Sequence, residues 1–198
     1  MESAHESTQF TQHSVDLRSA IRPASDIPQQ RFVGDSKPSH DEFTPISNYD
    51  GNSASTLSKP DGGFWTAPQT DTGNTYSDYI QDQLLQDAHA WDIEFAPGTT
   101  VLYVDSKRVL HALPQYNPGD CRVIDFEKLF DMYDVDGLYI EDDIAFAYSR
   151  KYFPISLYFW DVESCVWNSF DCITNTRYCG NIDKIRSYGN DTTTQTTL

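Results

Sequence analysis

The sequence has no long apolar run, and its first residues do not follow the pattern of a secretory leader. No stretch of about 18 consecutive apolar residues is present, the length at which a transmembrane helix becomes a candidate. The first residues, MESAHES, are acidic and polar, whereas a signal peptide begins with basic residues and continues with an apolar segment. We therefore expect no membrane partner and a cytoplasmic location.

Cysteines are few and have no metal-binding spacing. The 198 residues contain 4 cysteines, too few for a disulfide scaffold, and none belongs to a CxxC pair. The acidic stretch between residues 131 and 143 lacks the alternating loop and closing Glu of a calcium-binding EF-hand. We expect free thiols and no metal site.

Basic residues are scarce as well. The chain has 14 Lys and Arg against 30 Asp and Glu, a net charge of −16 at pH 7. Such a charge repels the phosphates of nucleic acids and anionic lipids, so we expect no nucleic-acid partner. The sequence also lacks a G-x-G-x-x-G motif and any other glycine-rich phosphate loop. Any NAD site in this chain must therefore differ from the Rossmann design.

Apolar and aromatic residues are present in sufficient number for a core. Hydrophobic residues make up 38% of the chain and aromatic residues 14%. Residues 1–30 and 188–198 are polar and show no apolar periodicity, so ordering them would not repay the entropy lost. We predict a flexible, disordered arm over residues 1–30, one domain over 31–187 and a flexible tail over 188–198.

Residue patterns predict more strands than helices, and so an α+β fold. Apolar residues recur at helical spacing between Tyr76 and Trp91, which predicts a helix capped by Thr75. A second helix is predicted over 125–133, behind an Asp125 cap. Strands are predicted from β-branched and aromatic residues at 31–35, 63–68, 99–105, 135–140 and 155–168, with 170–173 following closely.

Two acidic residues stand out within the predicted strand 155–168. An acidic side chain among aromatic and β-branched neighbours costs free energy unless it faces a cleft or water. Strand alternation places Asp161 and Glu163 on one face, roughly 6.6 Å apart along the strand. Two readings follow: a pair of carboxylates that faces a cleft, or two acids on the solvent side of an edge strand.

Four segments, in this order along the chain, resemble motifs of the ADP-ribosyltransferase-like superfamily, whose members split NAD at its nicotinamide bond. RFVGDSKP at 31–38 is similar to the first-strand motif of cholera-toxin-like members. GGFWTAP at 62–68 occupies the place of the aromatic-Ser-Thr-Ser strand, and YDVDGLY at 133–139 resembles the Tyr-Asp-Gly-Ile turn. DVESCVWNSFDCI at 161–173 resembles the closing pattern around the catalytic Glu.

The resemblance implies split mixed β-sheets with flanking helices, with NAD as the substrate. It implies transfer of ADP-ribose to a protein or another macromolecule, or to water. Glu163 would be the catalytic residue, bonding the ribose 2′-hydroxyl and stabilising the positive charge that develops when nicotinamide leaves. Asp161, two residues earlier, stands where family members orient the acceptor.

The resemblance also implies residues that bind NAD. Arg31 would replace the cation that the family carries at the position of Val33, and Gly34 would offer its backbone to the nicotinamide carboxamide. Thr66 would donate a hydrogen bond to the catalytic Glu, and Trp65 would stack on the ring. Each also has a purely structural interpretation. Arg31 would be a surface arginine and Gly34 a turn glycine, while Thr66 would be an ordinary strand residue and Trp65 a core aromatic residue.

Two departures from the family pattern support a rival function. Val33 replaces a cation, and Ala67 replaces a hydroxyl-bearing residue. Both changes favour a non-catalytic interaction module of a phage or mobile element on the same scaffold.

Overall fold

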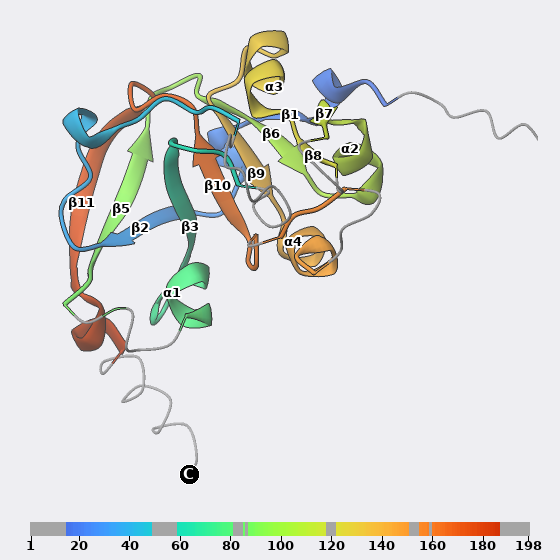
Figure 1. The fold of residues 1–198 in the computed structure, drawn as a ribbon. Helices are drawn as coiled ribbons and strands as arrows, with labels where there is room; N and C mark the ends of the chain where they lie inside the picture. Colours follow the sequence, from blue (N-terminus) through green and yellow to red (C-terminus); the bar gives the residue numbers. More distant parts are fainter. Residues whose placement is uncertain are drawn as a thin grey trace, which may run out of the picture.

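A computed structural model describes residues 15–48, 59–80, 85, 87–117, 122–150, 155–158 and 160–186. Its main feature is a nine-stranded mixed sheet in which β4 pairs with β3, beside the main path of strands (Figure 1). Among the described strands the pairings are antiparallel except for that of β6 with β9. In sheet order the strands are β1 (Ile21–Pro23), β6 (Thr100–Val104), β9 (Gly137–Ile140), β10 (Ser164–Trp167), β3 (Phe64–Thr70), β2 (Gln30–Gly34), β5 (His89–Phe95) and β11 (Ile173–Asn181), with β4 (Gly73–Asn74) beside β3.

Short helices and a two-stranded ribbon complete the fold. In Figure 1, α2, α3 and α4 lie around the half of the sheet that contains β6 and β9, and α1 lies at the end of β3. A further helical turn spans 182–186. The helices are α1 (Thr75–Tyr79), α2 (Lys107–Ala112), α3 (Phe126–Met132) and α4 (Asp142–Tyr148), the 3-10 turns are η1 (Leu17–Ala20), η2 (Ala24–Asp26) and η3 (His40–Glu42), and the ribbon is β7 (Gln115–Tyr116) with β8 (Val123–Ile124).

The α+β class with strands outnumbering helices is confirmed, and so are several predicted elements. β2, β3, β6 and β9 fall in the stretches where strands were predicted. The helix predicted behind Asp125 is α3, and the Asp125 side chain accepts a hydrogen bond from the backbone of Lys128 as an N-cap. In these segments the prediction depends on neighbouring residues, namely a capping Asp or a run of β-branched and aromatic residues.

The nine strands form two halves that meet at β3, and the split mixed sheets that the resemblance implied stay a prediction. β3 joins the two halves because it pairs with β10 through its first three residues and with β2 through Ala67 and Pro68. Successive residues of β3 therefore contribute to both halves of the sheet. An ADP-ribosyltransferase-like fold remains a proposal.

The predicted helix from Thr75 to Trp91 is wrong. α1 ends at Tyr79, and β5 begins at His89 between β2 and β11. Trp91, the last residue of the helical pattern, lies in β5, where backbone pairing with strands on both edges outweighs that pattern. The N-cap is Asn74 rather than Thr75, because the Asn74 side chain accepts from the Ser77 backbone. Residues 81–84 and 86 lie outside the described part.

The long strand predicted over 155–168 is also wrong, because among the described residues of this segment only Ser164–Trp167 forms a strand. Ile155, Leu157 and Trp160, which precede it, are buried without joining the sheet. Ser156 N–H donates to Arg122, and Leu157 N–H donates to Tyr148. β11 begins only at Ile173, so it includes just the last residue of the predicted 170–173 segment.

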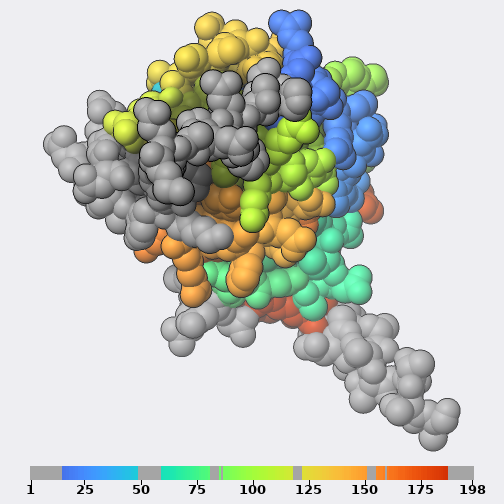
Figure 2. All heavy atoms as spheres, turned by 90° about the vertical axis from the view of Figure 1, so that its right-hand side faces the viewer, coloured from blue at the N-terminus to red at the C-terminus, as the bar shows by residue number. Residues whose placement is uncertain are grey.

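The predicted arm of residues 1–30 is wrong for its second half. Residues 15–30 belong to the folded unit: η1 packs near β6 and α2, and β1 pairs with β6. Figure 2 shows this blue segment against the body of the molecule. Four apolar residues of the segment are buried, Leu17, Ala20, Ala24 and Ile27. They are three, four and three residues apart, a spacing typical of a helix, yet the segment forms two 3-10 turns with the short strand β1 between them. Residues 1–14 and the predicted tail 188–198 lie outside the described part.

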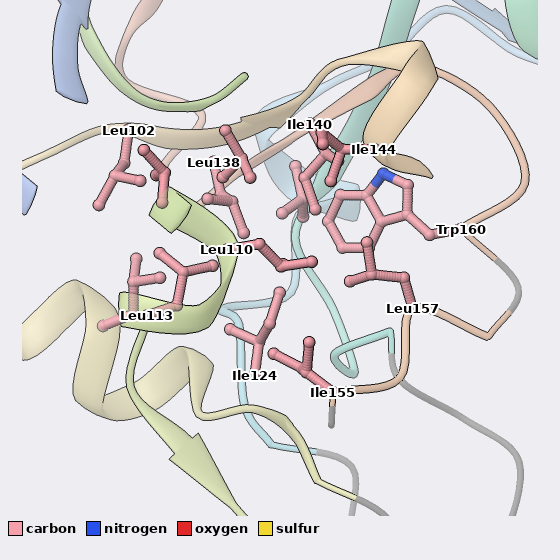
Figure 3. Close-up of a cluster of buried hydrophobic side chains, with 14 of the residues drawn as sticks. Leu102, Leu110, Leu113, Ile124, Leu138, Ile140, Ile144, Ile155, Leu157 and Trp160 are labelled. Carbon is pink, nitrogen blue, oxygen red and sulfur yellow. The ribbon is translucent and has the colours of Figure 1, made fainter. Parts of the chain in front are cut away.

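The sheet separates two apolar clusters. Alternate residues of β6 and β9, including Leu102, Leu138 and Ile140, pack with Leu110 of α2 and with Trp160 (Figure 3). Residues of the opposite parity, such as Tyr139 and Trp167, belong to a second cluster. Each face of the sheet is thus covered by its own apolar cluster, so the direction of a side chain decides which cluster it contacts. Within the described residues, no helix has both the length and the apolar character needed to cross a bilayer.

Candidate functional site

A cavity lies on the sheet face that carries Trp65. Its volume is about 230 Å³. We name it the Trp65 cavity. Its lining includes side chains from β2, β3, α1 and the loop before β10, among them Phe32, Val33, Trp65, Ala67, Tyr76 and Val162, together with Lys59 and Asp161. Such a cavity, mostly apolar with a few polar groups, is typical of small-molecule sites.

Lys59 is the cation of this cavity. Its Nζ lies 4.6 Å from the ring centroid of Trp65 and 5.9 Å from that of Tyr76. Burial lowers the pKa of Lys59, while the nearby Asp161 carboxylate acts in the opposite direction. Within the described part of the chain, no hydrogen bond or ion pair of Nζ accompanies these ring contacts. The ammonium therefore borders the cavity beside two aromatic rings.

Two glycines direct the chain from Lys59 into β3. Gly62 and Gly63 have φ values of +73° and +75°, which residues with a Cβ rarely adopt. A Cβ at Gly63 would lie 2.6 Å from a methyl group of Val166. The turn therefore requires glycine, and it places Lys59 over the Trp65 ring.

Trp65 lines the cavity, as its predicted role in stacking requires. Its indole N–H donates to the Gly62 carbonyl at 3.3 Å. Its ring packs edge-on against Trp160, with centroids 4.8 Å apart. Trp65 is therefore both a wall of the cavity and a partner of the core.

Asp161 also lines the cavity, but Glu163 does not. Alternation does not apply to this pair because residues 161–163 precede β10, with a bend at 162–163. The Tyr139 hydroxyl donates to the Glu163 carboxylate, and Tyr139 belongs to the core on the other face of the sheet. The structure thus separates the two carboxylates that the sequence analysis placed together.

Thr66 borders the cavity, but its hydroxyl has other partners. It donates to Oε1 of Gln30 at 2.8 Å and accepts from the indole N–H of Trp167 at 2.8 Å. The predicted hydrogen bond to Glu163 is absent from the contacts of these described residues. The hydroxyl instead links three strands, β2, β3 and β10.

Arg31 is neither a cavity residue nor a surface arginine. Its side chain is buried and forms an ion pair with Asp92, with Nε 2.7 Å from Oδ1. The guanidinium also donates to the carbonyls of Thr70 and Gly73. These contacts satisfy the guanidinium within the protein, so it is not free to bind a phosphate.

Gly34 ends β2 opposite His89 and does not itself line the cavity, although its neighbour Val33 does. A Cβ at this position would lie 2.7 Å from the ring of Phe32. Glycine is therefore accounted for by the position of the Phe32 ring rather than by contact with a ligand.

Lys59 and Tyr76 are among the cavity residues that the sequence analysis missed. Lys59 lies in a loop without periodicity, and the one local signal is the Gly62–Gly63 turn that follows it. Tyr76 was assigned to the buried face of a long helix, but it lies on α1 and is 44% exposed. Neither role follows from sequence spacing.

The raised pKa of Glu163 predicts a pH effect on stability. Burial raises this pKa above its ordinary value of 4.5, so the folded state binds the proton more tightly than the unfolded state. The resulting stabilisation is complete below the ordinary pKa and is lost as the pH rises through the folded pKa. Glu163→Gln, which stays neutral, should therefore be more stable than the parent at about pH 7, and the difference should narrow toward about pH 4. Urea unfolding at both pH values measures this; a difference that is constant with pH would contradict it.

Comparisons with known proteins place the chain in no family. No protein-family model matches it, and no solved structure matches it. A segment is 33% identical over 60 residues to palmitoyltransferase AKR1 of Candida albicans, and the match covers 26% of this chain and 7% of that protein. The chain therefore matches only a small part of that protein's length.

Proposed function

We propose that the chain binds NAD through the Trp65 cavity and cleaves its nicotinamide–ribose bond, transferring ADP-ribose to water or to a protein. One observation carries the proposal: Trp65, Thr66 and Asp161, three residues that the family resemblance selected, border one cavity although they come from two segments that are far apart in the sequence. Lys59 adds the cation that the family pattern requires and that Arg31 does not supply.

The dimensions and chemistry of the cavity fit one end of this ligand. A cavity of roughly 150 Å³ holds benzene, and this one measures about 230 Å³. It therefore has room for one substituted ring, and the remainder of a dinucleotide would extend from it. Trp65 and Tyr76 offer ring surfaces for stacking, and the Lys59 ammonium offers an ion pair to a phosphate.

Asp161 supplies the carboxylate in this arrangement. When bound, NAD contributes a leaving group, nicotinamide, that departs as a neutral base. A fixed carboxylate beside the ribose favours that departure because it stabilises the developing positive charge more than the ground state. Asp161 lines the cavity, and Lys59 lies close enough to feel its charge. Glu163 is the less suitable candidate because its carboxylate accepts from Tyr139 on the other face of the sheet.

Release of nicotinamide from NAD tests the proposal. Asp161→Asn should lower the rate about 100-fold or more, as expected when one preorganised electrostatic group is removed. Lys128→Met, a change on the exposed side of α3, is the matched control and should retain the parent rate. If Glu163→Gln abolishes release while Asp161→Asn does not, the assignment of Asp161 is wrong.

A second candidate is a binding module without catalysis. It is favoured by the contacts of Arg31 with Asp92 and of Glu163 with Tyr139, which use two expected active-site residues for structure. NAD that raises the melting temperature without releasing nicotinamide would support the module. If NAD neither raises the melting temperature nor releases nicotinamide, NAD is excluded as the ligand.

A further inference from the structure

We propose that Lys59 is a carbonyl-reactive amine, and that the Trp65 cavity binds small aromatic aldehydes covalently as imines of this residue. This inference concerns the same cavity as the proposed function, but it depends on the amine rather than on recognition of NAD.

The position of the amine is the first support. Lys59 Nζ lies over the Trp65 ring and near the Tyr76 ring. An aldehyde carried on an aromatic ring would therefore find ring surfaces beside the nucleophile. Such an arrangement converts a bimolecular encounter into a reaction between oriented groups.

The surroundings of the amine are the second support. The apolar walls include Val33, Ala67 and Val162, and the ring contacts of Nζ involve no hydrogen bond or ion pair within the described part of the chain. An ammonium in such a place loses solvation, which lowers the pKa of Lys59 and increases the fraction of neutral amine at a given pH. Desolvated lysines of this kind are the ones that form Schiff bases with carbonyl ligands.

The reaction needs no oxidant or reductant. The lone pair of neutral Nζ attacks the carbonyl carbon, a C–N bond forms, and the carbonyl π electrons move to oxygen. A proton passes through water from nitrogen to that oxygen, giving a carbinolamine. The hydroxyl group takes up a second proton and leaves as water, the C=N bond forms, and the remaining N–H proton is released on deprotonation.

The wild-type chain contains its own controls, since Lys59 is one of 6 lysines. The full chain is incubated with benzaldehyde and sodium cyanoborohydride, which reduces the imine to a stable secondary amine, and the modified lysines are identified by peptide mass spectrometry. We expect Lys59 to react about tenfold faster than the other lysines at neutral pH. We also expect benzaldehyde to show a stronger preference for Lys59 than propanal does, because only the former can stack.

Two variants sharpen the test. Lys59→Met should lose the preferred adduct and leave labelling of the other lysines unchanged. Asp161→Asn removes the carboxylate that raises the pKa of Lys59, so labelling of Lys59 at neutral pH should become faster. A lysine that is merely accessible would not respond to Asp161→Asn. The second variant also decides the matter should Lys59→Met fail to fold.

Equal labelling of all lysines in the wild-type chain would overturn the inference, and so would an unchanged rate at Lys59 in Asp161→Asn. The labelling is done without NAD, so its failure is independent of the proposed function. Selective labelling that excess NAD does not block would support the reactive amine while contradicting NAD binding in the same cavity.

Discussion

Asp92→Ala should destabilise the fold by about 3–5 kcal/mol, the range for breaking a buried ion pair. Asp92 and Arg31 are 2% and 5% exposed, so the substitution leaves a buried guanidinium without its counter-ion. Arg177 also donates to Asp92, from the neighbouring strand β11. The loss therefore affects the contact region of three strands, β2, β5 and β11.

Asp105→Ala is the matched control. Arg22 and Asp105 form an ion pair of the same length, 2.7 Å, but both side chains are 38% exposed. An exposed pair contributes about 0–1 kcal/mol, since water screens the charges. Urea unfolding of both variants measures the difference; equal losses would contradict the assigned importance of burial.

The same pair predicts sensitivity to acid. Although burial acts to raise it, the pKa of Asp92 is held below its ordinary value of 3.8 by the Arg31 hydrogen bond and by the charges of Arg31 and Arg177. The stabilisation is therefore present above the ordinary pKa and is lost as the pH falls through the folded pKa. On acidification, the free energy of unfolding should therefore fall less for Asp92→Asn than for the parent, when both are measured over the same pH range.

Trp160→Ala is the second large effect that we expect, at about 3–5 kcal/mol for removal of a buried Trp. Trp160 is fully buried, and it packs between Trp65 and Phe126 at centroid distances of 4.8 and 6.2 Å. Its loss removes the support behind Trp65. Ligand affinity of the Trp65 cavity should therefore fall together with stability.

Two further variants test whether the loss at Trp160 comes from removing a buried ring. Phe146→Ala removes an aromatic side chain that is 74% exposed on α4, and it should change stability by less than about 0.5 kcal/mol. Trp160→Phe should cost less than Trp160→Ala because it keeps a ring and removes an N–H that has no partner among the described residues. Thermal unfolding ranks the three; a Phe146→Ala loss as large as that of Trp160→Ala would contradict the burial argument.

The sequence predicts those elements whose signals are local. The Asp125 cap and the β-rich stretches at β6 and β9 depend on neighbouring residues, so local reasoning finds them. The helix predicted through Trp91 fails because β5 is determined by partners far away in the sequence. A spacing that suits a helix does not exclude a strand that is paired on both edges.

The candidate site shows the same limit. Alternation would place Asp161 and Glu163 together only if both belonged to a strand, and β10 begins after them. The fate of Arg31 depends on Asp92, 61 residues away, which no local pattern reveals. Trp65 was selected by the family resemblance, on a strand that was predicted correctly. Lys59 was missed because its position depends on a turn and on tertiary packing.

The most direct measurement is an NAD titration followed through the four tryptophan indole N–H signals by NMR, with assignments from single substitutions. The Trp65 indole N–H donates to Gly62 beside the cavity, whereas that of Trp167 is buried against Thr66. Binding in the Trp65 cavity predicts a saturable shift of the Trp65 signal with little change at Trp167. Signals that remain unchanged at millimolar NAD, or that shift only for tryptophans other than Trp65 and Trp160, would contradict it.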